Sequence, residues 1–142
     1  MAFQEKSSWV MIFALLLAGV FYVNSMLAIE LNAPSEAAQI AIGPVFGVYV
    51  AIIVIVSIIG QIAIAILNPS EANSDMDERD QLISAKAGNL SGMALGVGVV
   101  GSLISYFMFH NGNWLFHAVF LSLMASSLVE YALKVFFYRR GY

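Results

Sequence analysis

Long runs of apolar residues alternate with short polar connections along this 142-residue chain. Four runs stand out, and each is long enough, at a rise of about 1.5 Å per residue, to cross a hydrocarbon core of about 30 Å. Because backbone groups in lipid must form their hydrogen bonds within the chain, the runs are predicted to be helices. The expected helices cover residues 9–30, 44–67, 75–109 and 114–138.

Composition supports this interpretation. The chain is 61% hydrophobic and only 11% charged, whereas about a quarter of the residues in a soluble domain are charged. The predicted fold class is therefore an all-α integral membrane protein, with residues 1–142 forming one domain of four transmembrane helices in a bundle. The lipid bilayer is therefore an expected partner of the chain.

The two connections between the expected hairpin helices differ in length. The sequence "HNGN", residues 110–113, predicts a tight turn between the third and fourth helices. The connection at residues 31–43 is longer, and Pro34 followed by Ser35 and Glu36 is typical of a helix start. Gly43 and Pro44 then interrupt it. Two alternatives follow: a short helix on the membrane surface, or a kinked extension of the second helix.

Lysine and arginine predict the orientation of the helices. All of them fall on one side of the four expected spans. They are Lys6, Arg79, Lys86, Lys134, Arg139 and Arg140. By the positive-inside rule, both termini and the middle connection are expected in the cytoplasm.

A charged block precedes the third apolar run, and five of its six residues from Asp75 to Asp80 carry charge. The oxygen spacing of a calcium-binding loop is present, but the required glycine and bidentate glutamate are absent. A helix start explains the block better, with Ser74 as the predicted cap and acids in the first turn. We expect a cytoplasmic amphipathic start to the third helix. The alternative is a docking surface for a partner, made of Asp75, Asp77, Glu78, Arg79 and Asp80.

Two stretches resemble a known family. "DERDQLISAKAG", Asp77 to Gly88, is similar to the D-E-R-D-x-x-I signature of small prokaryotic four-helix inner-membrane proteins of unknown function, with Ile83 at the isoleucine position. "FQEKSSWVMIFALLLAGVFY", Phe3 to Tyr22, resembles the N-termini of such proteins. The resemblance implies the four-helix fold, a location in the inner membrane of a prokaryote and no assigned reaction. It also implies small helix-turn-helix regulators as neighbours of some members.

Small residues recur every four positions in the third run, at Gly88, Gly92 and Gly96. Such a stripe lets another backbone approach closely, which favours helix packing in lipid. The contact is expected within the monomer, and a homodimer contact is the alternative.

Glu130 lies inside the fourth run, and Lys134 follows four residues later. Acid-before-base order at this spacing favours an ion pair that reaches toward the headgroups. Because ionisable residues in a membrane are candidates for function, the alternative is a proton- or cation-coupled site at Glu130, with Gln61 as a second ligand.

The sequence gives little support for nucleic-acid binding, catalysis or metal binding. The chain has no cysteine, and its net charge of −3 provides no basic surface for nucleic acid. Phosphate-binding and nucleophile motifs are absent from the sequence. His110 and His117, even with Glu30 and Glu36, lack ligand spacing, so neither a metal nor a cofactor is expected.

The predicted function is therefore association rather than catalysis. The chain is expected to be a non-enzymatic accessory subunit, or a tether for a cytoplasmic partner such as a small regulator, with homo-oligomers as an option. The first alternative is a small cation- or proton-coupled transporter that works as a homodimer. The second is a membrane enzyme or metal site.

Overall fold

The computed structural model describes residues 3–32, 35–69 and 77–141. Four long helices make up almost all of this part of the chain. They are α1 (Phe3–Asn32), α2 (Ser35–Leu67), α4 (Glu78–Phe109) and α5 (Gly112–Arg140). Each is long and apolar enough to cross a membrane, so the chain is a multi-pass membrane protein, as the apolar runs predict.

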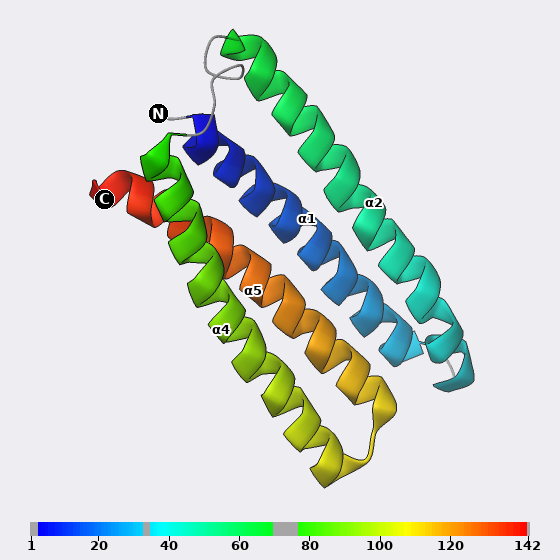
Figure 1. The fold of residues 1–142 in the computed structure, drawn as a ribbon. Coiled ribbons are helices and arrows are strands. Elements are labelled where there is room, and N and C mark those ends of the chain that lie inside the picture. The colour runs from blue at the N-terminus through cyan, green and yellow to red at the C-terminus, as the bar shows by residue number, and fades with distance from the viewer. Residues whose placement is uncertain (1–2, 33–34, 70–76, 142) are drawn as a thin grey trace.

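The helices form two antiparallel hairpins that meet side by side (Figure 1). α1 packs on α2, α4 packs on α5, and contacts between α1 and α5 join the two pairs. The order across the molecule is α2, α1, α5, α4, with both termini near the same end (Figure 1). Only 6% of the most apolar stretch is buried in α2 and in α4, against 28% in α1 and 17% in α5. The two outer helices therefore keep wide faces that the other described residues leave uncovered.

Small residues bring α4 and α5 together. The buried positions of α4 are Ile83, Ala87, Ser91 and Ser102, and the period of the helix places these on one face. The Ser126 hydroxyl of α5 donates to the Ser91 carbonyl at 2.8 Å, and this bond crosses the interface. A Cβ built on Gly98 would lie 2.6 Å from Ser122 Oγ, so glycine is required for this close approach.

An aromatic cluster joins α1, α2 and α5 toward the end where α1 and α2 connect. The ring of Phe120 lies 4.4 Å from that of Tyr22 and 4.8 Å from that of Tyr49, centroid to centroid. Tyr22 and His117 share a hydrogen bond of 2.7 Å between Oη and Nδ1. Aromatic pairs with tilted or edge-to-face geometry stabilise such a cluster beyond simple burial.

The turn between α4 and α5 is tight, as the sequence "HNGN" predicts. His110 ends α4 in the left-handed conformation, with φ of 52°, and its N–H donates to the Tyr106 carbonyl at 2.8 Å. Asn111 caps the start of α5, and its side-chain oxygen accepts a bond from the Trp114 N–H at 3.1 Å. The two caps satisfy backbone groups that the helix ends leave unpaired.

All four helix starts differ from the predicted ones. α1 begins at Phe3 rather than at residue 9, and α5 begins at Gly112 rather than at residue 114. α4 begins at Glu78 rather than at residue 75, because Asp77 is extended and its carboxylate accepts a bond from the Glu78 N–H at 2.7 Å. Asp77 therefore caps the helix instead of lying in its first turn, while the predicted cap, Ser74, lies outside the described residues. α2 begins at Ser35 and continues through Pro44, although proline removes one backbone donor and crowds the carbonyl four residues earlier.

Candidate functional site

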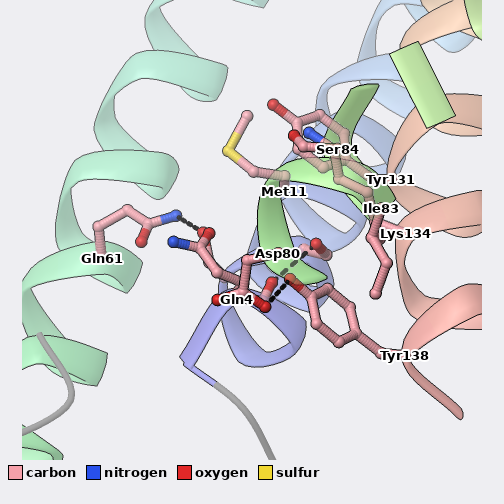
Figure 2. A pocket seen from close by; sticks show the side chains of 11 residues that line it. Gln4, Met11, Gln61, Asp80, Ile83, Ser84, Tyr131, Lys134 and Tyr138 are labelled. Carbon is pink, nitrogen blue, oxygen red and sulfur yellow. Dashed lines mark hydrogen bonds between the residues drawn. The ribbon is translucent and has the colours of Figure 1, made fainter. Parts of the chain in front are cut away.

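Polar side chains from all four helices surround one cavity at the end of the molecule that holds both termini. Its volume is about 240 Å³. Figure 2 shows Gln4 of α1, Gln61 of α2, Asp80 of α4 and Lys134 of α5 around it. We call this space the polar cavity. The remaining lining residues are Ser7, Ser8, Met11, Ile83, Ser84, Tyr131 and Tyr138.

The contact between Asp80 and Tyr138 closes one side of the polar cavity. The Tyr138 hydroxyl donates to the Asp80 carboxylate at 2.6 Å, and this bond ties the start of α4 to the end of α5 (Figure 2). Arg79 supports the same junction, because its guanidinium donates to the Tyr138 carbonyl at 3.5 Å. A hydrogen bond to an ionised acceptor is stronger than one between neutral groups.

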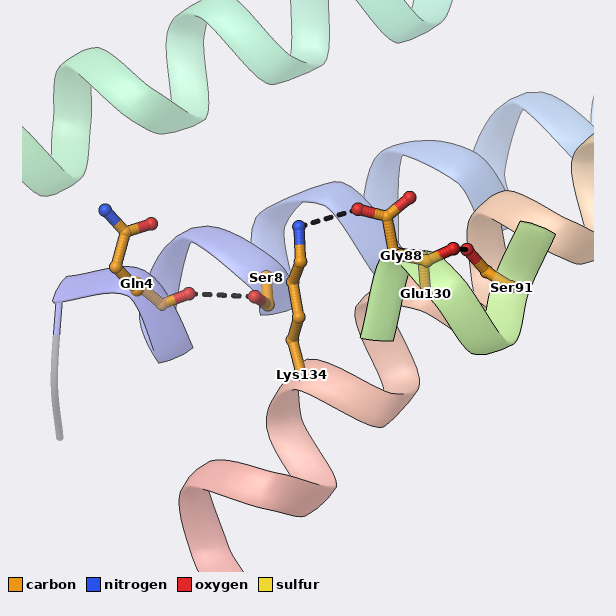
Figure 3. Close-up of polar contacts among 6 residues, drawn as sticks. All are labelled: Gln4, Ser8, Gly88, Ser91, Glu130 and Lys134. Atoms are coloured by element: carbon orange, nitrogen blue, oxygen red, sulfur yellow. Dashed lines mark hydrogen bonds and ion pairs between the residues drawn. The ribbon is translucent and has the colours of Figure 1, made fainter. Parts of the chain in front are cut away.

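Glu130 and Lys134 form the ion pair that their spacing predicts, with 2.7 Å between Lys134 Nζ and Glu130 Oε1 (Figure 3). Lys134 is 17% exposed and also lines the polar cavity, whereas Glu130 is 33% exposed. The ammonium also lies 5.0 Å from the centre of the Tyr131 ring. Such a pair neutralises two charges that are costly in a membrane.

The first turns of α1 make further polar contacts with other helices. Gln61 of α2 donates to Ser7 Oγ at 2.7 Å, and Lys6 donates to the Asn68 side chain at the same distance. Glu5 is only 7% exposed and accepts a bond of 3.2 Å from Arg139 near the end of α5. No sequence pattern predicts this contact of Glu5. Its one signal was an acid before the first apolar run, in a chain whose C-terminal end is basic.

The predicted docking block divides into two parts. Asp80 and Arg79 bond to Tyr138 within the chain, whereas Asp77 and Glu78 are exposed at the helix start. Asp75 lies outside the described residues. Of the block, the structure therefore leaves Asp77 and Glu78 as the acids without a bond to another helix, and Asp80 belongs to the wall of the polar cavity.

The predicted glycine stripe does not face another part of the described chain. A Cβ built on Gly88, Gly92 or Gly96 would meet no atom within 4 Å. The glycine that packs against α5 is Gly98 instead. The buried positions of α4 that pack on α5 and the open positions Gly88, Gly92 and Gly96 form two neighbouring stripes along the helix. The two stripes are about 100° apart around its axis.

The structure places the two histidines in separate contacts. Among the residues that the structure describes, no three histidine, aspartate or glutamate side chains are placed to hold one metal ion. His117 bonds to Tyr22, and His110 ends α4. The side chain of Glu36 is not among those described.

Comparisons with family models, curated proteins and solved structures found no match. The resemblance to the D-E-R-D-x-x-I family stays a prediction.

Proposed function

We propose that this chain is a non-enzymatic protein of a prokaryotic inner membrane, with both termini in the cytoplasm, that acts by association. It would serve as an accessory subunit that binds a transmembrane helix of another protein through the outer face of α4. We define this outer face by Gly88, Gly92 and Gly96. The observation that carries the proposal is that no atom of the described chain lies within 4 Å of a Cβ built on any of the three.

Glycine in a helix interior needs a reason, because it weakens the helix relative to alanine by about 1 kcal/mol in water. At Gly98 the reason is the close approach of Ser122. At the outer face the described part of the chain provides no such neighbour. Small residues on one stripe let a second helix approach in lipid, so the glycines favour a partner helix over plain contact with acyl chains.

Site-specific photocrosslinking in native membranes tests this proposal. A photoreactive residue at Met93, which is 60% exposed beside the stripe, should give one crosslinked species of defined mass. In a chain that also carries Gly92→Ile, the yield should fall about tenfold, as expected when roughly 1.4 kcal/mol of association free energy is lost.

Gly101→Ile is the matched control. Gly101 is also exposed and also has no atom within 4 Å of a built Cβ, but nine residues from Gly92 place it on the opposite side of the helix. This variant should crosslink like the parent. Equal yields from the parent and Gly92→Ile would contradict the proposal. A species of twice the chain mass would identify the partner as a second copy.

A cytoplasmic tether is a narrower form of the same proposal, with Asp77 and Glu78 as its exposed acids. Asp77→Lys together with Glu78→Lys should then abolish crosslinking to a soluble partner and leave the membrane crosslink intact. The transporter alternative has less support, because Glu130 is paired with Lys134 and Gln61 bonds to Ser7. Loss of substrate flux or of substrate resistance in Glu130→Gln would support the transporter alternative.

The proposed orientation has its own test. A reporter fused after Tyr142 should be active only in the cytoplasm, and one inserted at Asn111 should be active only outside. Reversed activities would overturn the assignment of the basic end to the cytoplasm.

A further inference from the structure

The polar cavity does not end among its polar residues. Met11 of α1 and Tyr131 of α5 line it, and the same two residues line a second cavity of about 320 Å³. This second space, which we call the apolar groove, lies between α1, α2 and α5, with Leu15, Ile53 and Leu123 among its walls. The two spaces therefore adjoin, one polar and the other apolar.

The apolar groove has the length of one bilayer leaflet. Along α5 it extends from Tyr131 to Phe120, about three turns or 16 Å of helix. Half of a hydrocarbon core is about 15 Å. A molecule with a polar head and an acyl chain matches a polar space at the membrane interface that continues into a groove of this length.

The charges in the polar cavity select the head group. Asp80 and Lys134 face it with opposite signs, and Glu130 is paired with Lys134. The two charged residues that line the cavity therefore sum to zero, so a zwitterionic head group brings a cation for Asp80 and an anion for Lys134, whereas an anionic head group brings no cation for Asp80. Lysine has three donors and a carboxylate has about four acceptor sites, and the bonds to Glu130 and Tyr138 use one at each group.

We propose that the polar cavity and the apolar groove together bind one zwitterionic glycerophospholipid that carries a primary ammonium group. Its phosphate lies at Lys134, its ammonium at Asp80, and one acyl chain lies in the groove past Leu15 and Leu123. A primary ammonium donates hydrogen bonds to Asp80, which a quaternary ammonium cannot do. The proposal goes beyond association through α4, because neither space includes Gly88, Gly92 or Gly96.

Native mass spectrometry of the purified full chain tests the proposal. The chain is exchanged into detergent with equal amounts of phosphatidylethanolamine, phosphatidylcholine and phosphatidylglycerol that carry identical acyl chains. One phosphatidylethanolamine should remain per chain, favoured about tenfold over each of the others, as expected for one charge-assisted hydrogen bond. Equal retention of the three lipids would overturn the proposal.

Two variants separate the head site from the chain site. Asp80→Asn keeps an acceptor for Tyr138 and removes the charge, so the preference for phosphatidylethanolamine over phosphatidylcholine should disappear. Glu78→Gln, an exposed acid outside the cavity, should leave the preference unchanged. Ser127→Phe fills the groove that Ser127 lines and should lower retention of all three lipids, whereas Ala125→Phe on the exposed side of α5 should not.

A soluble probe distinguishes a membrane lipid from a free metabolite with the same head. Glycerophosphoethanolamine has the head group and no acyl chains. If it binds as tightly as the lipid, the groove takes no part and the lipid proposal is wrong. If Ser127→Phe does not fold, Asp80→Asn still decides the question, because lipid selectivity unchanged in that variant would overturn the assignment of the ammonium to Asp80.

Discussion

The two faces of α4 use similar residues for different purposes. On the inner face, Asp80, Ile83, Ala87, Ser91 and Ser102 follow one another at helical spacing, and Gly98 lies on the same stripe against Ser122. On the outer face, Gly88, Gly92 and Gly96 are just as regularly spaced, and a Cβ built on any of them meets no atom of residues 3–32, 35–69 and 77–141 within 4 Å. Small size alone therefore does not tell which stripe packs within the chain.

The difference lies in what the small residues are paired with. The inner face meets complementary polar groups of α5, namely the hydroxyls of Ser126 and Tyr138, which bond to Ser91 and Asp80. In lipid, where burial of apolar surface drives little association, close packing and such bonds hold helices together. The outer face has the close-packing surface and no matching helix in the described chain. The same glycine-to-isoleucine substitution should therefore destabilise the fold on the inner face and leave its stability unchanged or slightly higher on the outer face.

The largest effect is expected from Gly98→Ile on the inner face. Its Cβ would lie 2.6 Å from Ser122 Oγ and 2.7 Å from Ser122 Cβ, so α4 and α5 must separate to accept it. We expect a loss of about 1–3 kcal/mol, the usual cost of overpacking. Thermal unfolding in detergent, followed by circular dichroism, measures it. Wild-type stability in Gly98→Ile would mean that the two helices do not meet at this point.

The next effect is expected from Tyr138→Phe, which removes the 2.6 Å bond to Asp80 at the start of the inner face. Because the junction is only partly buried, we expect a loss of about 1 kcal/mol, somewhat below the range for bonds to charged groups. Tyr106→Phe, at an exposed tyrosine of α4, is the control and should change stability by less than about 0.5 kcal/mol. If the two variants lost equal stability, the bond from Tyr138 to Asp80 would add nothing to the fold. Asp80 would then not differ in its role from the exposed acids.

The helices of this protein are predictable from sequence, because length and hydropathy alone decide them. A run of about 20 apolar residues has no other stable conformation in lipid, and the pairing of Glu130 with Lys134 follows from spacing within one helix. The turn at "HNGN" is equally local. In each of these cases the residues that decide the structure are close together in the chain.

The polar cavity depends on contacts that no local pattern contains. Glu5 meets Arg139 and Asp80 meets Tyr138 only because α1 and α4 both pack on α5. The same limit explains the glycines. A helix period of 3.6 places small residues on two adjacent stripes of α4, and the sequence does not indicate which stripe faces α5. The helix cap shows the same limit, because Ser74 and Asp77 are both good capping residues and the sequence does not decide between them.

A smaller effect is expected from Ser126→Ala, which removes the bond of 2.8 Å from Ser126 to the Ser91 carbonyl in the middle of the inner face. Hydrogen bonds between helices in membranes contribute about 0.6 kcal/mol on average, and we expect a loss of that size. Ser127→Ala is a matched control, because Ser127 bonds at 3.1 Å to Leu123 in its own helix. A loss as large in Ser127→Ala would show that the crossing bond adds nothing.

The smallest effect on folding is expected from Gly92→Ile on the outer face, although the substitution is the same as at Gly98. The new side chain enters open space, and replacing glycine by isoleucine improves helix propensity by about 0.5 kcal/mol in water. Under conditions where the chain is monomeric by light scattering, Gly92→Ile should therefore unfold at or slightly above the wild-type temperature. Destabilisation equal to that of Gly98→Ile would mean that a part of the chain covers the outer face, and the assignment of that face to a partner helix would then fail. If the variant instead keeps its stability and loses its crosslinked partner, the two glycine stripes differ in function as well as in packing, because one is needed to fold the chain and the other to associate.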